Sequence, residues 1–209
     1  MTLSKAYSDV IYNLWDENNR NGVFAPTYFK EIISKENKKF EGFGANDSKD
    51  LILFLYEKLH KELNTQNKNI TIEKIDSSES EPEIEYFKCV NKFETKNKSI
   101  ISDLFYYTQG NITKCLDCGK LKYKFSMYNI LLFPLESTRL FKLTKESNFP
   151  TIDIYDCFNY YMSMQKLRSG DKLFCSNCAK KCDVGIYYKI SSFPEILTII
   201  LHKGNNNIL

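Results

Sequence analysis

Two short stretches decide the fold: residues 115–119 read Cys-Leu-Asp-Cys-Gly, and residues 175–178 read Cys-Ser-Asn-Cys. In a C-x-x-C pair both sulfurs can reach one ion from a tight turn, and two such pairs complete a tetrahedral four-cysteine zinc site. A redox C-x-x-C pair usually opens a helix after a strand, whereas each pair here lies beside turn residues and strand-like sequence. The sequence therefore predicts a structural zinc ion, in preference to disulfides or free thiols, with four ligands: Cys115, Cys118, Cys175 and Cys178.

The other three cysteines have weaker signals. Cys182 extends the second pair to C-x-x-C-x-x-x-C and could act as a substitute ligand. Because four ligands already suffice, the simpler interpretation is a spare thiol beside the metal. Cys89 and Cys157 have no spacing partner, and free cysteine is commonly a small buried hydrophobe.

Length and composition narrow the function classes. The chain has 209 residues, with 43% hydrophobic and 26% charged residues, which fits one large soluble domain or two small ones. The net charge is only +3, and three of the 29 basic residues are arginines, which argues against nucleic-acid binding. The longest apolar runs, 51–56 and 196–201, are far shorter than the ~20 residues that cross a bilayer, and no signal peptide is apparent. We therefore expect no membrane partner and a cytoplasmic or nuclear location.

Periodicity predicts helices first and strands later. Apolar residues at helical spacing predict helices over 3–17, 26–35 and 47–63, the last with leucines at positions 51, 55, 59 and 63. Residues 64–83 are polar and are predicted to form an exposed insertion. Strict alternation predicts a half-buried strand over 121–127. Further elements are a helix over 152–164 and strands over 130–135, 184–190 and 196–201. This order predicts an α+β fold.

Several segments resemble the ubiquitin-specific protease family of cysteine deubiquitinases, and they occur in that family's order. Residues 43–51 are similar to its Gln-Gln-Asp-x-x-Glu-Phe segment, although Ala45 and Asn46 replace the glutamines. The two cysteine pairs are similar to the family's zinc knuckles. Residues 131–135 and 192–201 are similar to its Leu-x-Leu-Pro and Leu-Pro-x-x-Leu strands, so the resemblance covers about residues 20–204.

The resemblance implies a hand-shaped domain that holds ubiquitin. Residues 1–209 are then a single partial deubiquitinase domain: 1–63 belong to a helical thumb, 64–99 are a polar insertion or connection, 100–190 hold the zinc-tipped fingers and a connecting helix, and 191–209 begin a palm strand. Asp47 and Asp50 match family acids that receive the basic tail of ubiquitin. Carboxylates suit that role because they form charge-assisted hydrogen bonds with basic groups. The alternative for Asp47, capping of a helix, is compatible with it.

The family's catalytic boxes are not recognisable. Its nucleophile lies in an Asn-x-Cys box before the thumb helices, and its base lies in a Gly-His-Tyr box after the strand at 196–201. His60 is expected on a helix surface, and His202 stands where the family usually has Lys or Arg. We therefore expect a fragment or an inactive form without a catalytic pair.

Two other classes of function compete with this interpretation. The first is a non-catalytic ubiquitin-binding or scaffolding zinc module. The second is a nucleic-acid-binding zinc ribbon, in which the lysines at 114, 120, 122 and 124 would hold phosphates while Tyr123 and Phe125 stack on bases. The nearly neutral net charge makes the nucleic-acid-binding ribbon the least favoured of the three interpretations.

Overall fold

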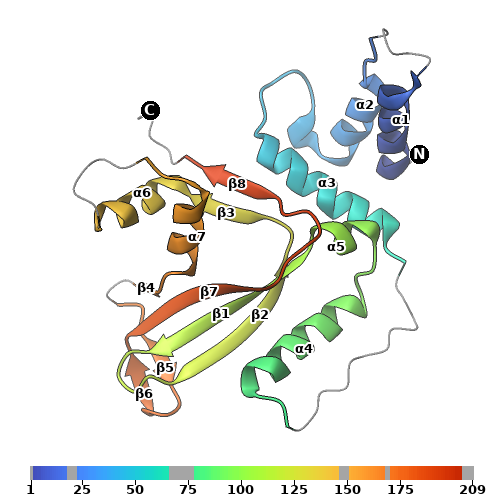
Figure 1. Cartoon of the computed structure of the whole chain (residues 1–209). Helices are drawn as coiled ribbons and strands as arrows, with labels where there is room; N and C mark the ends of the chain where they lie inside the picture. The colour runs from blue at the N-terminus through green and yellow to red at the C-terminus, as the bar shows by residue number, and fades with distance from the viewer. Residues whose placement is uncertain (1, 18–22, 66–77, 146–150, 168–169, 204–209) are drawn as a thin grey trace. The chain divides into compact units, whose positions relative to one another are not determined.

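The computed structural model describes residues 2–17, 23–65, 78–145, 151–167 and 170–203 (Figure 1). The chain divides into two compact units, one formed by Met1–Gln66 with Asn97–Ser102 and the other by Asn67–Lys96 with Asp103–Leu209. The mixture of helices and sheets confirms the predicted α+β class. The insertion predicted over 64–83 falls mostly on 66–77, outside the described residues. No described helix is long and apolar enough to cross a membrane.

The first unit is helical. It contains α1 (Leu3–Trp15), α2 (Thr27–Glu36), the 3-10 turn η2 (Lys38–Phe40) and α3 (Ser48–Leu63). The three predicted helices are confirmed to within two residues at either end. The Glu62 carboxylate of α3 accepts hydrogen bonds from the N–H groups of Leu3 (3.0 Å) and Ser4 (2.7 Å). These N–H groups have no partner within α1, so the carboxylate satisfies and stabilises the start of that helix.

The buried face of α3 differs from the expected leucine stripe. Phe54, Leu59 and His60 are the buried residues of the helix, whereas Leu63 remains 38% exposed. The expectation that His60 lies on the surface is wrong: its Nδ1 lies 2.7 Å from the Ser99 hydroxyl and its Nε2 lies 3.3 Å from the Asn97 side-chain oxygen. The segment 97–102 returns to the end of α3, a long-range contact that helical periodicity does not predict.

The second unit is built on a four-stranded antiparallel sheet in the order β2-β1-β7-β4. The strands are β1 (Tyr107–Cys115), β2 (Leu121–Tyr128), β4 (Gln165–Lys166) and β7 (Val184–Ser192). The alternation predicted for 121–127 is confirmed, because exposed and half-buried residues alternate along the first half of β2.

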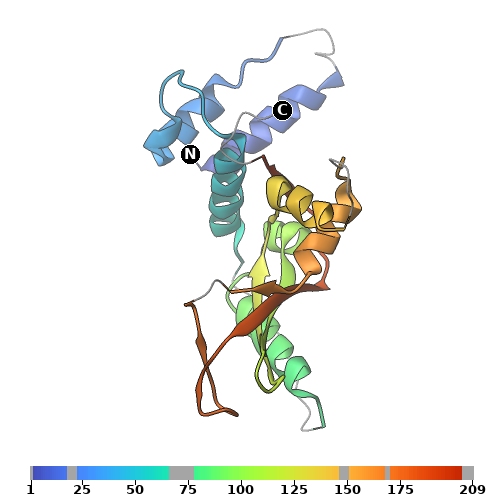
Figure 2. The same ribbon diagram turned by 90° about the vertical axis from the view of Figure 1, so that its left-hand side faces the viewer.

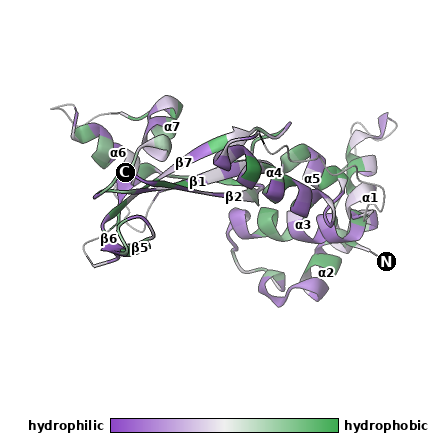
Figure 3. Cartoon of the chain, turned by 90° about the horizontal axis from the view of Figure 1, so that it is seen from below, coloured by the Kyte–Doolittle hydropathy of each residue, from purple (hydrophilic) through white to green (hydrophobic). Residues whose placement is uncertain are grey.

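Helices cover the two faces of this sheet. On one face, Tyr86 of α4 (Glu81–Glu94) packs edge-on against Phe125, with 5.7 Å between ring centroids. On the other, Tyr161 of α7 (Ile154–Met162) packs 5.5 Å from Tyr188. Gly110 lies opposite Phe125 in the ladder, and a Cβ there would come within 2.9 Å of the Phe125 ring. The close packing of this ring therefore requires glycine. Figure 3 shows that the helices carry both hydrophobic and hydrophilic residues, as expected for elements buried on one side.

Two smaller sheets complete the unit. β3 (Leu131–Pro134) pairs in parallel with β8 (Ile199–His202), and β5 (Leu173–Cys175) forms a hairpin with β6 (Lys180–Cys182). Figures 1 and 2 show this hairpin at the end of the sheet away from α6 (Leu135–Leu143) and α7. The strand predicted over 196–201 begins later, at Ile199, because the Ile196 N–H donates to the Leu104 carbonyl instead of a ladder partner.

Three helices were not predicted from the sequence: α4, α6 and the short α5 (Ile100–Phe105). α4 lies in the segment interpreted as a polar connection. Its start carries recognisable signals, since the Ser80 and Glu83 side chains form a capping box and Pro82 occupies the first turn. The surrounding polar composition of 64–83 obscured them.

The core beneath α6 and α7 offers a test of the packing. Phe133 is fully buried in a cluster with Tyr107, Leu131 and Cys157. We expect Phe133→Ala to reduce the free energy of unfolding by about 3–5 kcal/mol, because it leaves a cavity that rigid neighbours cannot fill. Leu132→Ala is the matched control: Leu132 is adjacent in β3 but 42% exposed, so its loss should have a much smaller effect. Denaturant unfolding of both variants provides the measurement, and equal effects would contradict the assigned burial.

Candidate functional site

The four cysteines predicted to bind zinc converge on one point. Their Sγ atoms all lie within 4.8 Å of one another, with 4.0 Å between Cys115 and Cys178 and 3.7 Å between Cys118 and Cys175. Four sulfurs at ~2.3 Å from a central zinc ion stand about 3.8 Å apart in a tetrahedron, so the observed spacing fits zinc. All seven cysteines are free thiols, and these separations far exceed the ~2.05 Å of a disulfide.

Local backbone geometry builds the first knuckle. Cys115 is the last residue of β1, and its N–H donates to the Lys120 carbonyl (2.9 Å) while the Gly119 N–H donates to the Cys115 carbonyl (2.9 Å). Gly119 has φ +77°, a left-handed conformation that glycine adopts without steric cost. The turn therefore folds back tightly enough for both thiols of the pair to face the same side.

The sheet brings the second knuckle to the first. Cys115 lies opposite Val184 in the β1–β7 ladder, and the Leu116 N–H donates to the Asp183 carbonyl (2.9 Å). The β5–β6 hairpin, which carries Cys175 and Cys178, leads directly into β7. The chain between the pairs leaves the sulfur cluster, forms β2, β3, α6 and α7, and returns to the cluster through this hairpin.

Two polar contacts link the knuckles, and sequence reasoning missed both. The Lys180 ammonium lies 2.9 Å from the Asp117 carboxylate, and the Lys120 ammonium donates to the Ser176 hydroxyl at 3.2 Å. Each contact joins the first C-x-x-C turn to the β5–β6 hairpin. The residues that make these contacts are ordinary polar and charged residues in the sequence, so no local pattern distinguished them.

Backbone amides favour the thiolate forms that a metal needs. The Lys120 N–H lowers the pKa of Cys118 to about 6, and the Cys118 and Asp117 N–H groups lower the pKa of Cys115. The pKa of Cys178 is raised, chiefly because its thiol hydrogen-bonds to Cys118. A cation bound among the four sulfurs would favour the thiolate form of each of them.

Outside the sulfur cluster, neither Cys89 nor Cys157 has the environment of an activated nucleophile. Burial raises the pKa of the Cys89 and Cys157 thiols, the reverse of what activates a nucleophile. Cys157 lies in the hydrophobic core beside Phe133, as its interpretation as a buried hydrophobe predicted. His60 is hydrogen-bonded to Ser99 and Asn97, and His202 ends β8.

Asp47 and Asp50 stand at the start of α3. Asp47 is the N-cap, and its carboxylate accepts a hydrogen bond from the Lys49 N–H at 2.8 Å. Asp50 forms an ion pair with Lys39, and this contact lowers the pKa of the Asp50 carboxyl. The side chain of Asp47 is 56% exposed and that of Asp50 is 28% exposed, so both can meet a ligand from solvent.

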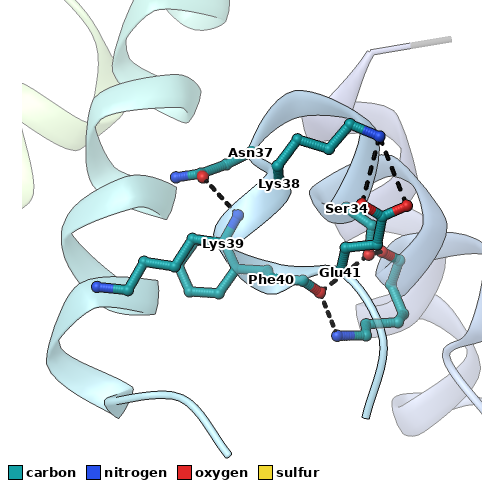
Figure 4. Close-up of polar contacts among 7 residues, drawn as sticks. Ser34, Asn37, Lys38, Lys39, Phe40 and Glu41 are labelled. Atoms are coloured by element: carbon teal, nitrogen blue, oxygen red, sulfur yellow. Dashed lines mark hydrogen bonds and ion pairs between the residues drawn. The ribbon is translucent and has the colours of Figure 1, made fainter. Parts of the chain in front are cut away.

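The η2 turn fixes the position of Lys39 (Figure 4). The Asn37 side chain accepts a hydrogen bond from the Lys39 N–H at 3.0 Å, and the Phe40 carbonyl accepts from Ser34 and Lys30. The Phe40 ring packs 5.4 Å from Phe54 of α3. Sequence reasoning missed Lys39, because it lies eleven positions before its acid and in a different element.

Comparison with known proteins identifies relatives of the whole chain. The family model "Ubiquitin carboxyl-terminal hydrolase" matches residues 1–208. Human ubiquitin carboxyl-terminal hydrolase 32 is 31% identical over 134 residues, which cover 64% of this chain and 8% of that protein. Bovine ubiquitin carboxyl-terminal hydrolase 21 is 24% identical over 216 residues, which cover 96% of this chain and 37% of that protein. The chain thus spans well under half the length of these relatives.

Solved structures share the fold. The SAGA Ubp8/Sgf11/Sus1/Sgf73 DUB module bound to ubiquitin aldehyde aligns with a TM-score of 0.63 at 15% identity, covering 95% of this chain and 36% of that chain. Another structure of the module, bound to monoubiquitin, aligns with a TM-score of 0.65 at 13% identity and covers 95% of this chain and 37% of that chain.

The sulfur cluster yields a prediction about metal content. Protein purified without chelator should contain about one zinc per chain, since the cluster offers one tetrahedral site. Cys175→Ser should lower this content, whereas Cys89→Ser, which removes a thiol from α4, should leave it unchanged. Elemental analysis measures the zinc. Zinc-free protein with disulfides among these four cysteines by mass spectrometry would show that the assignment is wrong.

Proposed function

The chain belongs to the ubiquitin carboxyl-terminal hydrolase family, and we propose that it is a ubiquitin-binding, zinc-stabilised part of a deubiquitinase domain. The single observation that carries this proposal is the match of the family model over residues 1–208. Two structural neighbours support it, because they were solved with ubiquitin aldehyde and with monoubiquitin. Ubiquitin or ubiquitinated proteins are accordingly the proposed partners.

Zinc has a structural role in this proposal. Cys115, Cys118, Cys175 and Cys178 are the proposed ligands, and bound zinc would neutralise the repulsion among their thiolates. Four sulfurs that all lie within 4.8 Å of one another could supply all four ligands of a zinc ion, which is the ligand set of structural rather than catalytic zinc. The ion would fasten the β1–β2 turn to the β5–β6 hairpin.

The start of α3 is the proposed binding site for a basic peptide tail. Asp47 and Asp50 place two carboxylates beside the N-terminus of a helix, within reach of solvent. An arginine side chain can donate parallel hydrogen bonds to a carboxylate, which lysine cannot. Such a tail would displace Lys39 from Asp50, because the Lys39–Asp50 pair is exposed and exposed ion pairs contribute little stability.

Charge-neutralising variants test this site. Asp47→Asn keeps the helix cap, since asparagine caps as well as aspartate, but removes the charge. We expect it to weaken ubiquitin binding about tenfold, which corresponds to about 1.4 kcal/mol. This loss is at the low end for a hydrogen bond to a charged group, because the site is exposed. Asp50→Asn should act in the same direction. Isothermal titration calorimetry with ubiquitin provides the measurement.

Lys39 supplies the opposite control. Lys39→Gln removes the competing cation from Asp50 and should strengthen ubiquitin binding. Asp9→Asn, which removes an exposed acid of α1 paired only locally with Lys5, should leave binding unchanged. Binding that is unaffected by both Asp47→Asn and Asp50→Asn would exclude these residues from the site.

The polypeptide should bind ubiquitin without cleaving its conjugates. Thiol catalysis needs a thiolate and a base within hydrogen-bond distance, and burial raises the pKa of Cys89, Cys157 and Cys182, the three cysteines outside the sulfur cluster. A fluorogenic ubiquitin substrate and a ubiquitin probe with a thiol-reactive C-terminus measure this directly. Turnover or labelling that disappears in Cys89→Ser or Cys157→Ser would overturn the prediction and identify the nucleophile.

A further inference from the structure

A fifth thiol lies against the four proposed zinc ligands. Cys182, the last residue of β6, is 1% exposed and belongs to one buried cluster with Cys115 and Cys175, against which Cys178 packs. Its sulfur interacts with those of Cys115 and Cys178 and lies 3.6 Å from the Lys180 carbonyl oxygen. It is not among the four sulfurs that all lie within 4.8 Å of one another. Cys182 therefore lies beside this group of four sulfurs and is not one of them.

The position of Cys182 makes Cys178 the ligand that it can replace. Both belong to the β5–β6 hairpin, and their sulfurs interact. Between them, Ala179 has φ 53°, the only positive φ of a non-glycine residue in the described chain. This left-handed conformation is unfavourable for alanine, so a rearrangement of the turn that withdraws Cys178 can release strain.

We infer that Cys182 is a reserve zinc ligand, which occupies the fourth position when Cys178 is unavailable. In the exchange the sulfur of Cys178 leaves the metal and takes up a proton, while Cys182 loses its proton to water and binds. No group is oxidised or reduced. Zinc suits such an exchange, because its filled d shell imposes no preference between two tetrahedral four-sulfur arrangements. The inference rests on the proposed zinc site.

Cobalt substitution in the full chain tests the inference. The sulfur-to-cobalt charge-transfer band reports how many thiolates bind the metal. Cys178→Ser should keep the intensity of the unmodified protein, because Cys182 takes the vacant position. In Cys178→Ser/Cys182→Ser the band should have about three quarters of that intensity, because three of the four thiolates remain. The double variant should also bind zinc at least ~10-fold more weakly, as measured by competition with a chromophoric chelator. Even the loss of a residue that only hydrogen-bonds to a metal ligand lowers metal affinity about 10–100-fold.

Three control variants separate the role of Cys182 from the number of thiols, from an oxygen ligand and from a loss of the fold. Cys178→Ser/Cys89→Ser removes an unrelated thiol and should match Cys178→Ser. Cys182→Ser should retain the full band. Cys178→Ala, which offers no oxygen ligand, should behave as Cys178→Ser. If both Cys178 variants are unfolded by circular dichroism while Cys182→Ser is folded, the inference is contradicted, because a chain with a reserve ligand keeps its zinc-dependent fold.

The unmodified protein separates this inference from the zinc proposal. If it binds neither zinc nor cobalt, the proposed zinc site itself fails. If it binds with four thiolates, but Cys178→Ser and the double variant lose the same intensity, the zinc site stands and the reserve role of Cys182 is overturned.

Discussion

The meeting of four cysteine sulfurs at the end of β1 is the constraint on which the second unit depends. Cys115 is both a strand residue paired with Val184 and a member of the sulfur cluster. A slip of one residue in the β1–β7 ladder would turn every side chain to the opposite face and move the Cys115 sulfur away from Cys175 and Cys178. The geometry of the sulfur cluster and the register of the sheet therefore fix each other.

The same register determines the packing of both helical layers. Gly110 must lie opposite Phe125 for the ring to approach the sheet closely, and α4 then packs against that ring through Tyr86. On the other face, Tyr161 of α7 donates a hydrogen bond to the Gln109 side chain. Gln109 and Gly110 are neighbours in β1, so their side chains face opposite sides. Because β1 carries Cys115, Gln109 and Gly110, its register fixes the position of the sulfur cluster and the packing of both helical layers.

Features that depend on residues close together in the chain could be predicted from the sequence, whereas features that depend on contacts between distant residues could not. The convergence of the four cysteines could be predicted because each pair is a local turn with its own spacing. Helix 47–63 could be identified because its N-cap, Asp47, and its apolar residues are neighbours along the chain. The burial of His60 could not, because its partners arrive from residues 97–99. Lys39 likewise meets Asp50 only after the η2 turn has placed it.

At the start of α3, one residue type can serve both the fold and the proposed binding of a basic tail. A carboxylate at an N-cap satisfies a backbone N–H and favours the positive end of the helix dipole, so Asp47 is stabilising without any partner protein. Its second oxygen lies 4.0 Å from the Lys49 ammonium, and the side chain is 56% exposed. In the free chain Asp50 is paired with the exposed Lys39. An arginine side chain could replace this lysine, because its guanidinium group can donate two parallel hydrogen bonds to a carboxylate. The two carboxylates are therefore already held in place in the free protein, and the contact that the proposed basic tail would displace is an exposed ion pair, which contributes little stability.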